Sequence, residues 1–279
     1  MKNDNQLIKN TVKQFKEKLR VEFNRKTSIT TVICELVTFI DELIINLFNK
    51  NQLDQGDDFC LLALGSYGRR ELLLYSDIDL LLLHRDKISK TKLHHAQNFI
   101  QDCWDVGLEI SHQITTVSAC AELASHNVTV ISSIMDMFLL CGQSSLMEEL
   151  IYQTHPLHIW TSKDYFNAKL LEQKKRSIKY GETAYNLEPN VKYGQGGLCD
   201  LQILLSIGKR HFNIKKLADG IDYGFITEKE LDKLAYCQHF LWNVRFALHC
   251  FAGKAEERLS FDYQIKLANF FGYKDAPHS

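Results

Sequence analysis

The sequence predicts an α+β protein in which a small mixed β-sheet is flanked by N-terminal helices and followed by an all-helical domain. Two short apolar runs, FCLLAL and IDLLLL, are bounded by glycine or charged residues and are typical of buried strands. Most of the remaining chain has apolar residues at three- and four-residue spacing, the period of an amphipathic helix. With three prolines and no Gly/Ser-rich linker, we expect the helices to pack tightly.

Composition limits the partners that the chain can have. A 279-residue chain with 45% hydrophobic content can form cores for two modest domains. Its net charge of -1 argues against a nucleic-acid partner. No apolar run reaches the roughly 18 residues of a membrane span, and MKNDNQLIKN lacks a signal core, so we expect a cytoplasmic protein with no membrane segment. The eight cysteines include no CxxC pair, which favours reduced thiols over a zinc site.

Three parts follow one another along the chain. Residues 1–54 read as a helical segment whose two amphipathic helices, 5–24 and 28–49, would cover the next domain. Residues 55–125 would form the sheet domain, with FCLLAL, IDLLLL and LEISHQITTV as strands and a polar helix before the third. Residues 126–279 would be helical except for one glycine-rich loop, NLEPNVKYGQGGLCD.

Two aspartates at the start of the second apolar run suggest a metal site. Alternate side chains of a strand point to opposite faces, so Asp77 and Asp79 share a face while Ile78 and Leu80 take the other. Their Cα atoms would lie roughly 6.5 Å apart, close enough for two carboxylates to share a divalent ion. Without a cation, two like charges this close would repel. The pattern therefore favours Mg²⁺.

A glycine turn precedes these aspartates. Gly65, Ser66 and Gly68 lie where a strand gives way to a short helix, so backbone N–H groups and a hydroxyl can face a phosphate. Arg69 and Arg70 offer guanidinium groups for the rest of a triphosphate. Alone, such a turn is as easily an ordinary strand-to-helix connection. Followed by DxD at the mouth of the next strand, it indicates a nucleotide site.

Glu109 in LEISH is the candidate for a third acidic residue. On a strand it would share a face with Ser111 and Gln113, opposite Leu108 and Ile110. We expect Glu109 to be either a metal ligand or catalytic base, or else a strand residue exposed to solvent.

The pattern G-S-x-G-R-x-E-L followed by S-D-I-D-L resembles the nucleotidyltransferase superfamily of DNA polymerase β. More narrowly, GSYGRRELLLYSDIDLLLL, GLEISHQITTV, NLEPNVKYGQGGLCDLQILLSIGKRHF and LWNVRFALHCFAGKAEERLSFDYQIKLANFFGY are similar, in order, to the N-terminal half of the bacterial protein-PII uridylyltransferase family. The resemblance runs from about residue 55 to 274. It implies a polymerase β-like core in the predicted sheet domain.

The resemblance also implies an activity: transfer of UMP from UTP to a tyrosine of the signalling protein PII, with Mg²⁺ and release of pyrophosphate. By this resemblance Gly65 and Ser66 would contact the triphosphate, Asp77 and Asp79 would bind Mg²⁺, and Glu109 would match the third acidic position. The family's HD and ACT domains match nothing in residues 1–279. Two other readings stay open: a related nucleotidyltransferase with another nucleotide or acceptor, and a nucleotide-sensing pseudoenzyme.

The second glycine-rich segment resembles the family signature N-L-x-P-x-x-K-x-x-x-G-G-L-R-D. It departs from the signature at Cys199, where the family has arginine. Lys192 could reach the nucleotide, and Asp200 could cap the following helix and orient a partner. Alternatively, the loop docks the helical domain. The shared positions are Asn186, Pro189, Lys192, Gly196, Gly197, Leu198 and Asp200.

Overall fold

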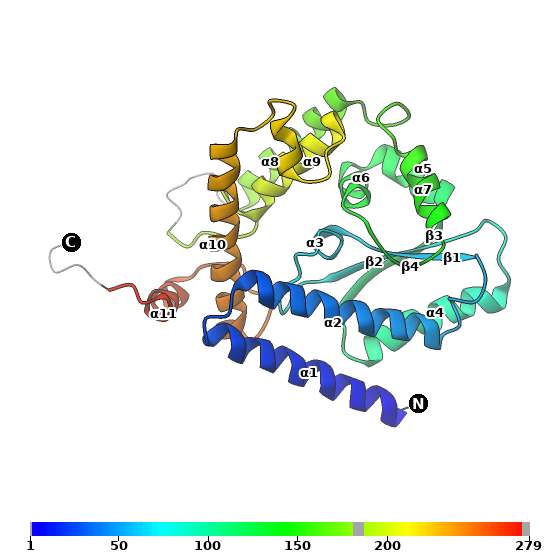
Figure 1. Cartoon of the computed structure of the whole chain (residues 1–279), viewed down its shortest axis with the longest axis horizontal. Helices are drawn as coiled ribbons and strands as arrows, with labels where there is room; N and C mark the ends of the chain where they lie inside the picture. The colour runs from blue at the N-terminus through cyan, green and yellow to red at the C-terminus, as the bar shows by residue number, and fades with distance from the viewer. Residues whose placement is uncertain (1, 181–186, 275–279) are drawn as a thin grey trace. The chain divides into compact units, whose positions relative to one another are not determined.

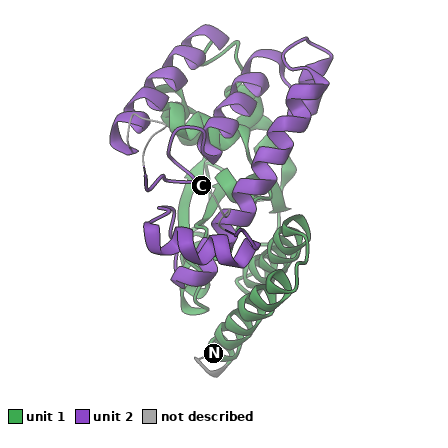
Figure 2. Ribbon diagram, turned by 90° about the vertical axis from the view of Figure 1, so that its left-hand side faces the viewer, with its two compact units in different colours: residues 1–161 green, residues 162–279 purple. Residues whose placement is uncertain are grey.

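The computed structural model describes residues 2–180 and 187–274. It confirms an α+β architecture and divides into two compact units, residues 1–161 and 162–279, coloured separately in Figure 2. Asn186 of the family signature lies outside the described residues.

The first unit holds the sheet and the helices around it (Figure 1). Its elements in chain order are α1 (Lys2–Asn24), α2 (Ile29–Lys50), β1 (Phe59–Ala63), α3 (Gly65–Gly68), β2 (Ile78–His84), α4 (Lys90–Asp105), β3 (Ile110–Thr116), α5 (Val117–His126), α6 (Val128–Met135), β4 (Phe138–Gly142) and α7 (Ser144–Gln153).

The sheet is mixed, as the sequence predicts. In the described residues its strand order is β3-β2-β1-β4, with β2 and β3 parallel and the other pairs antiparallel. All five residues of β1 are buried, and β2 is buried except at Asp79 and His84. Central strands covered on both faces need such continuous apolar runs. His84 ends the strand, whereas Asp79 lies among buried apolar residues, so Asp79 calls for a chemical reason.

The boundary of the sheet unit differs from the sequence prediction. Residues 126–161 group with the sheet, because β4 pairs with β1 through Leu62↔Leu139 and Ala63↔Phe138. The sequence on both sides of β4 has helical periodicity, and the five residues FLLCG are too few to show the pattern of a strand between helices. Residues 1–54 also group with the sheet rather than apart from it.

The N-terminal helices cover one side of the sheet, as expected. In Figure 1 α2 lies along one side of the sheet with α1 outside it, while α5, α6 and α7 lie on the other side. The rings of Phe15 on α1 and Phe39 on α2 stack with their centroids 4.0 Å apart. The inward face of α2 contributes Ile33, Leu36, Ile40 and Ile44 among its buried residues. This burial fixes α2 against the sheet.

The second unit is helical. Its elements are α8 (Ser162–Tyr180), α9 (Leu198–Phe212), the 3₁₀ helix η1 (Leu217–Ile221), α10 (Glu228–Ala252) and α11 (Phe261–Phe271). A capping box between Thr227 and Glu230 starts α10, and Gly253 ends it with a φ of 67°. Tyr165 and Phe246 are fully buried in this unit.

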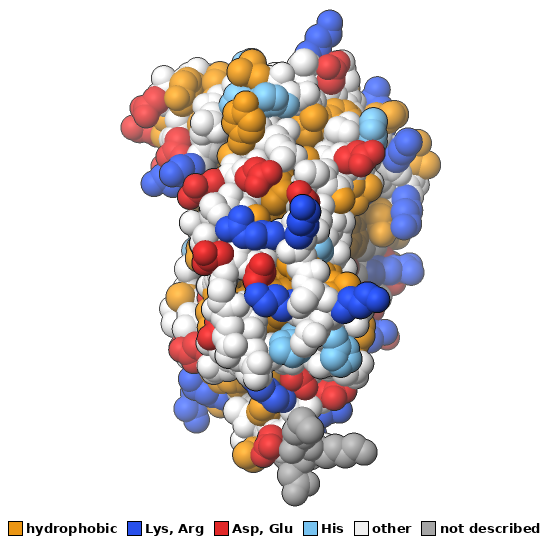
Figure 3. Space-filling view, turned by 90° about the vertical axis from the view of Figure 1, so that its right-hand side faces the viewer, with side chains coloured by type: hydrophobic (Ala, Val, Ile, Leu, Met, Phe, Trp, Pro, Cys, Tyr) orange, Lys and Arg blue, Asp and Glu red, His pale blue; other side chains and the backbone are white. Residues whose placement is uncertain are grey.

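The surface carries both signs of charge. On the face drawn in Figure 3, Lys and Arg side chains are interspersed with Asp and Glu side chains, which fits a net charge of -1. Within residues 2–180 and 187–274, no helix combines the length and apolar character that crossing a membrane requires. The eight cysteines are free thiols, of which three are buried, three half-buried and two exposed.

The close approach at Gly68 yields a stability prediction. A Cβ there would lie 2.1 Å from the Asp136 carbonyl oxygen and 2.8 Å from that of Ala63. Because both neighbours are backbone, we expect Gly68→Ala to lower the free energy of unfolding by at least about 1–3 kcal/mol, measured by urea denaturation. Gln97→Ala is the control, since Gln97 is exposed on α4 and alanine is a good helix former. Equal effects of the two changes would contradict this packing argument.

Candidate functional site

The connection between β1 and β2 is fixed by backbone hydrogen bonds. Leu64 N–H donates to the Asp79 carbonyl oxygen at 2.9 Å, and Gly68 N–H donates to the Leu64 carbonyl oxygen at 2.9 Å. Glu71 N–H donates to the Ser66 carbonyl oxygen at 2.8 Å. The Gly65-Ser66 turn therefore has a defined place at the mouth of β2.

Gly65 and Asp79 lie side by side. Gly65 has a φ of 55°, a left-handed conformation that favours glycine. A Cβ on Gly65 would lie only 2.8 Å from Asp79 Oδ2, so the missing side chain makes room for this carboxylate. The structure thus brings the predicted turn and one of the predicted metal ligands together.

Asp77 lies just before β2 and is exposed, whereas Asp79 is half-buried within the strand. Ile78 and Leu80 are buried, as expected from strand alternation. Carboxylate oxygens are the ligands that Mg²⁺ prefers, and one or two carboxylates plus substrate phosphates are a usual set. The residue types and their alternation therefore fit a magnesium ion held with a nucleotide.

Arg69 faces carboxylates of the protein itself. Its Nε donates to Glu71 Oε2 at 2.9 Å, and its NH1 donates to Asp136 Oδ2 at 2.5 Å. Burial opposes its charge, but Glu71 and Asp136 outweigh this and raise the pKa of Arg69 above its ordinary value. The side chain is only 11% exposed, so the structure differs from the expected free phosphate ligand. A nucleotide contact by Arg69 stays a prediction.

Arg70 is also held internally. Its two terminal nitrogens donate to the two carboxylate oxygens of Asp41 on α2, and its guanidinium lies 4.5 Å from the ring centroid of Phe138. Asp41 also accepts a hydrogen bond from Tyr67 Oη at 2.8 Å. Sequence reasoning missed Asp41 and Asp136, because nothing local in the sequence indicates pairs 29 and 67 residues apart.

The shortness of α3 changes the electrostatic argument. With four residues, Gly65–Gly68, it has little of the macrodipole that a longer helix directs at a phosphate. Any phosphate contact here would depend on individual N–H groups, the Ser66 hydroxyl and a bound cation.

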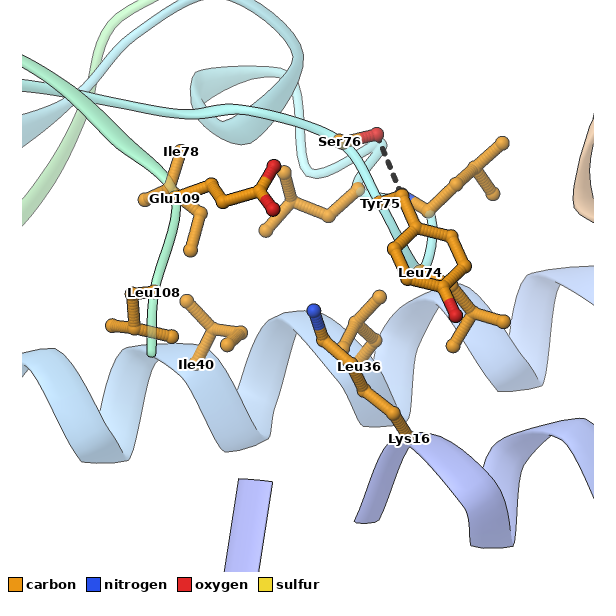
Figure 4. A pocket seen from close by; sticks show the side chains of 11 residues that line it. Lys16, Leu36, Ile40, Leu74, Tyr75, Ser76, Ile78, Leu108 and Glu109 are labelled. Carbon is orange, nitrogen blue, oxygen red and sulfur yellow. Dashed lines mark hydrogen bonds between the residues drawn. The ribbon is translucent and has the colours of Figure 1, made fainter. Parts of the chain in front are cut away.

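Glu109 lies at a different place from the aspartates. It lines a small pocket with Lys16, Leu36, Ile40 and Ile78, as Figure 4 shows. Glu109 comes just before β3 begins at Ile110, so strand alternation does not fix its side chain on the face of Ser111, the residue paired with Asp79. Burial lowers the pKa of Lys16, and the Glu109 charge partly offsets that shift. In the part of the chain that the structure describes, no three His, Cys, Asp or Glu side chains are grouped for a metal. Glu109 as a third ligand stays a prediction.

The second glycine-rich segment is tied to other parts of its own unit. Asp200 accepts hydrogen bonds from Gly196 N–H at 2.8 Å and from Arg176 on α8. Asp200 lies in the first turn of α9, whose N-cap is Gly197, so these bonds tie the loop to α8 and do not form the helix cap that the sequence suggested. Val191 N–H donates to the Glu257 carbonyl oxygen at 2.9 Å, and Asn190 forms an isolated bridge with Arg258. Cys199 is half-buried in the first turn of α9.

Lys192 belongs to this second unit, where its Nζ lies 4.8 Å from the ring centroid of Tyr193. Its predicted contact with the nucleotide is not tested by this arrangement and stays a prediction.

A buried charged cluster supports this loop. Arg245 donates through Nε and NH2 to both carboxylate oxygens of Glu257, at 2.7 and 2.5 Å. Burial alone would raise the pKa of Glu257, but His249 and Arg245 outweigh it and lower that pKa to about 2. His249 Nε2 is 3.7 Å from Glu257, too long for a hydrogen bond, so we attribute most of the effect to Arg245.

Comparison with known proteins identifies the relatives of this chain. It is 70% identical over 278 residues to the bifunctional uridylyltransferase/uridylyl-removing enzyme of Legionella pneumophila, covering 100% of this chain and 32% of the relative. This chain is a homologue of the N-terminal part of that enzyme. The Pseudomonas aeruginosa and Methylococcus capsulatus enzymes of the same name are 39% and 40% identical, covering 96% and 92% of this chain and 30% and 29% of theirs.

Two family models match parts of this chain. The putative nucleotidyltransferase model DUF294 matches residues 10–114, and the GlnD PII-uridylyltransferase model matches residues 164–279. The chain spans about a third of the length of the curated relatives it matches. Among solved structures, a chain from the crystal structure of the toxin-antitoxin with AMP-PNP aligns at 16% identity over 50% of this chain and 94% of that one, with a TM-score of 0.28, too low to bear on the fold.

The Arg245–Glu257 pair gives a prediction for how the stability of this chain depends on pH. Glu257→Gln is expected to lower the free energy of unfolding at pH 7 by roughly 3 kcal/mol, because it leaves Arg245 buried without its charged partner. The folded pKa of about 2 lies below the ordinary 4.5, so this contribution is complete above pH 4.5 and is lost as the pH falls toward 2. Urea denaturation between pH 7 and pH 3 measures it. A wild-type advantage that does not shrink in acid would contradict the assignment, and the exposed Asp232→Asn on α10 is the control.

Proposed function

We propose that this chain carries the uridylyltransferase part of a bifunctional enzyme and transfers UMP from UTP to a tyrosine hydroxyl of PII, with pyrophosphate leaving. The observation that carries the proposal is the contact between Gly65 and Asp79, which sets a glycine turn directly against an acidic strand residue. The names of its relatives and the two matching family models support the reaction class.

Asp77 and Asp79 would hold Mg²⁺ together with the triphosphate. When bound, the ion would neutralise charge on the phosphates and favour in-line displacement at the α-phosphorus. Gly65 and Ser66 would offer backbone N–H groups and a hydroxyl to the phosphate oxygens. Positive charge from Arg69 and Arg70 is already balanced by carboxylates, so the magnesium ion would be the main local counter-charge.

The carboxylates can be tested by incubating the chain with PII, Mg²⁺ and labelled UTP. We expect label on PII with the wild type and at least about a hundredfold less with Asp77→Asn or Asp79→Asn, because each change removes a ligand that acts on the transition-state charge. Asp86→Asn is a matched control, an exposed aspartate just beyond the other end of β2.

Parallel assays with four labelled nucleoside triphosphates test the base specificity, since neither the glycine turn nor the DxD motif distinguishes one base from another. Binding of Mg-UTP without pyrophosphate release would instead favour a nucleotide sensor. If wild type and both Asp→Asn variants label PII equally, the proposed site is wrong. A loss in Glu109→Gln as large as in Asp79→Asn would support the predicted role of Glu109 in the metal site.

A further inference from the structure

Asp41 connects the N-terminal helices to the glycine turn. It projects from α2, next to the buried Ile40, and its side chain is 19% exposed. Its Oδ1 accepts hydrogen bonds from Tyr67 Oη at 2.8 Å and from Arg70 NH1 at 2.9 Å, and its Oδ2 accepts one from Arg70 NH2. A single carboxylate thus holds Tyr67 within α3 and Arg70 two residues after the helix ends.

Through Tyr67 and Arg70, Asp41 can restrain the position of the Gly65-Ser66 turn. Tyr67 is fully buried in α3, one residue after Ser66, and burial together with Asp41 raises the pKa of its hydroxyl far above the usual range. Arg70 has a φ of 65°, which is uncommon for a residue other than glycine and persists where surrounding contacts impose it. Its bidentate pair with Asp41 and its stacking on Phe138 supply such contacts.

The opposite side of the turn is held separately. Arg69 pairs with Asp136, which lies between α6 and β4, and the Asp136 carbonyl oxygen also faces Gly68. Asp136 therefore fixes one side and Asp41 fixes the other. The Asp41 side is the one supplied by the N-terminal helices, for which the sequence indicated only a covering role.

We propose that Asp41 is a positioning residue for the proposed nucleotidyl transfer: through Tyr67 and Arg70 it holds the Gly65-Ser66 turn against Asp79. This inference rests on the proposed function. Asp41 itself touches neither nucleotide nor metal. Its removal lets the turn move relative to the carboxylate, so it weakens the productive placement of the triphosphate.

Two measurements on Asp41→Asn test the inference. Hydrogen–deuterium exchange reports the amides of residues 65–71, whose partners include the Leu64, Gly65 and Ser66 carbonyls. Kinetics with Mg-UTP report KM and kcat separately. We expect faster exchange confined to these amides and a KM for Mg-UTP raised between about tenfold and a hundredfold. The control is Glu42→Gln, the exposed neighbour on α2, which should change neither quantity.

The double variant Asp41→Asn/Arg70→Gln tests the route. If Asp41 acts through Arg70, the double variant has a KM close to that of Arg70→Gln alone rather than the product of both effects. Should Asp41→Asn unfold, which a thermal melt reveals, Tyr67→Phe removes one hydrogen bond and keeps the ion pair. It should move exchange and KM in the same direction by a smaller factor.

Three results would overturn the inference. Tighter Mg-UTP binding by Asp41→Asn would mean that Asp41 restrains Arg70 from acting as a phosphate ligand. Exchange and KM equal to those of Glu42→Gln would mean that Asp41 does not hold the turn. A wild-type chain that binds no Mg-nucleoside triphosphate would overturn the proposed function and this inference with it, whereas wild-type binding with an unaffected Asp41→Asn overturns the inference alone.

Discussion

The candidate site depends on one backbone hydrogen bond, from Leu64 N–H to the Asp79 carbonyl oxygen. This bond fixes the end of β1 against the start of β2. It also brings the Asp79 carboxylate so close to residue 65, the residue after Leu64, that only glycine fits there. At the other end of α3, Gly68 closes onto the Asp136 carbonyl oxygen. Because the sheet and its flanking backbone set this geometry, the turn needs no ligand to form. A pre-formed site requires little reorganisation when the ligand binds.

For the two arginines after the turn, burial decides between binding a phosphate and pairing with a carboxylate of the protein itself. A guanidinium that is 11% exposed, as in Arg69, is costly without a carboxylate partner, and Asp136 and Glu71 provide it. Arg70 meets the same requirement through Asp41. From the sequence alone both residues look available to phosphate, because neither their burial nor partners on distant elements can be read from the motif.

Features that depend on local sequence patterns were therefore predicted better than features that depend on contacts between residues far apart in the chain. Strands β1, β2 and β3 follow from apolar runs and alternation, and the nearness of the turn to Asp79 follows from their adjacency along the chain. β4 was missed because five apolar residues between helices carry no distinctive period, and its pairing with β1 moves the unit boundary to residue 161. The pocket that Glu109 shares with Lys16 could not be predicted either, because Lys16 comes from a helix about ninety residues earlier in the chain.

The two glycine-rich segments are held in place in the same way, by ion pairs between carboxylates and arginines nearby. Glycines supply backbone freedom but no side chains to pack, so the neighbouring residues must fix the loop. In the first unit Asp41 and Asp136 do this by pairing with Arg70 and Arg69, and in the second unit Asp200 pairs with Arg176. Asp200 therefore keeps a cationic partner although Cys199 stands where the family signature has arginine.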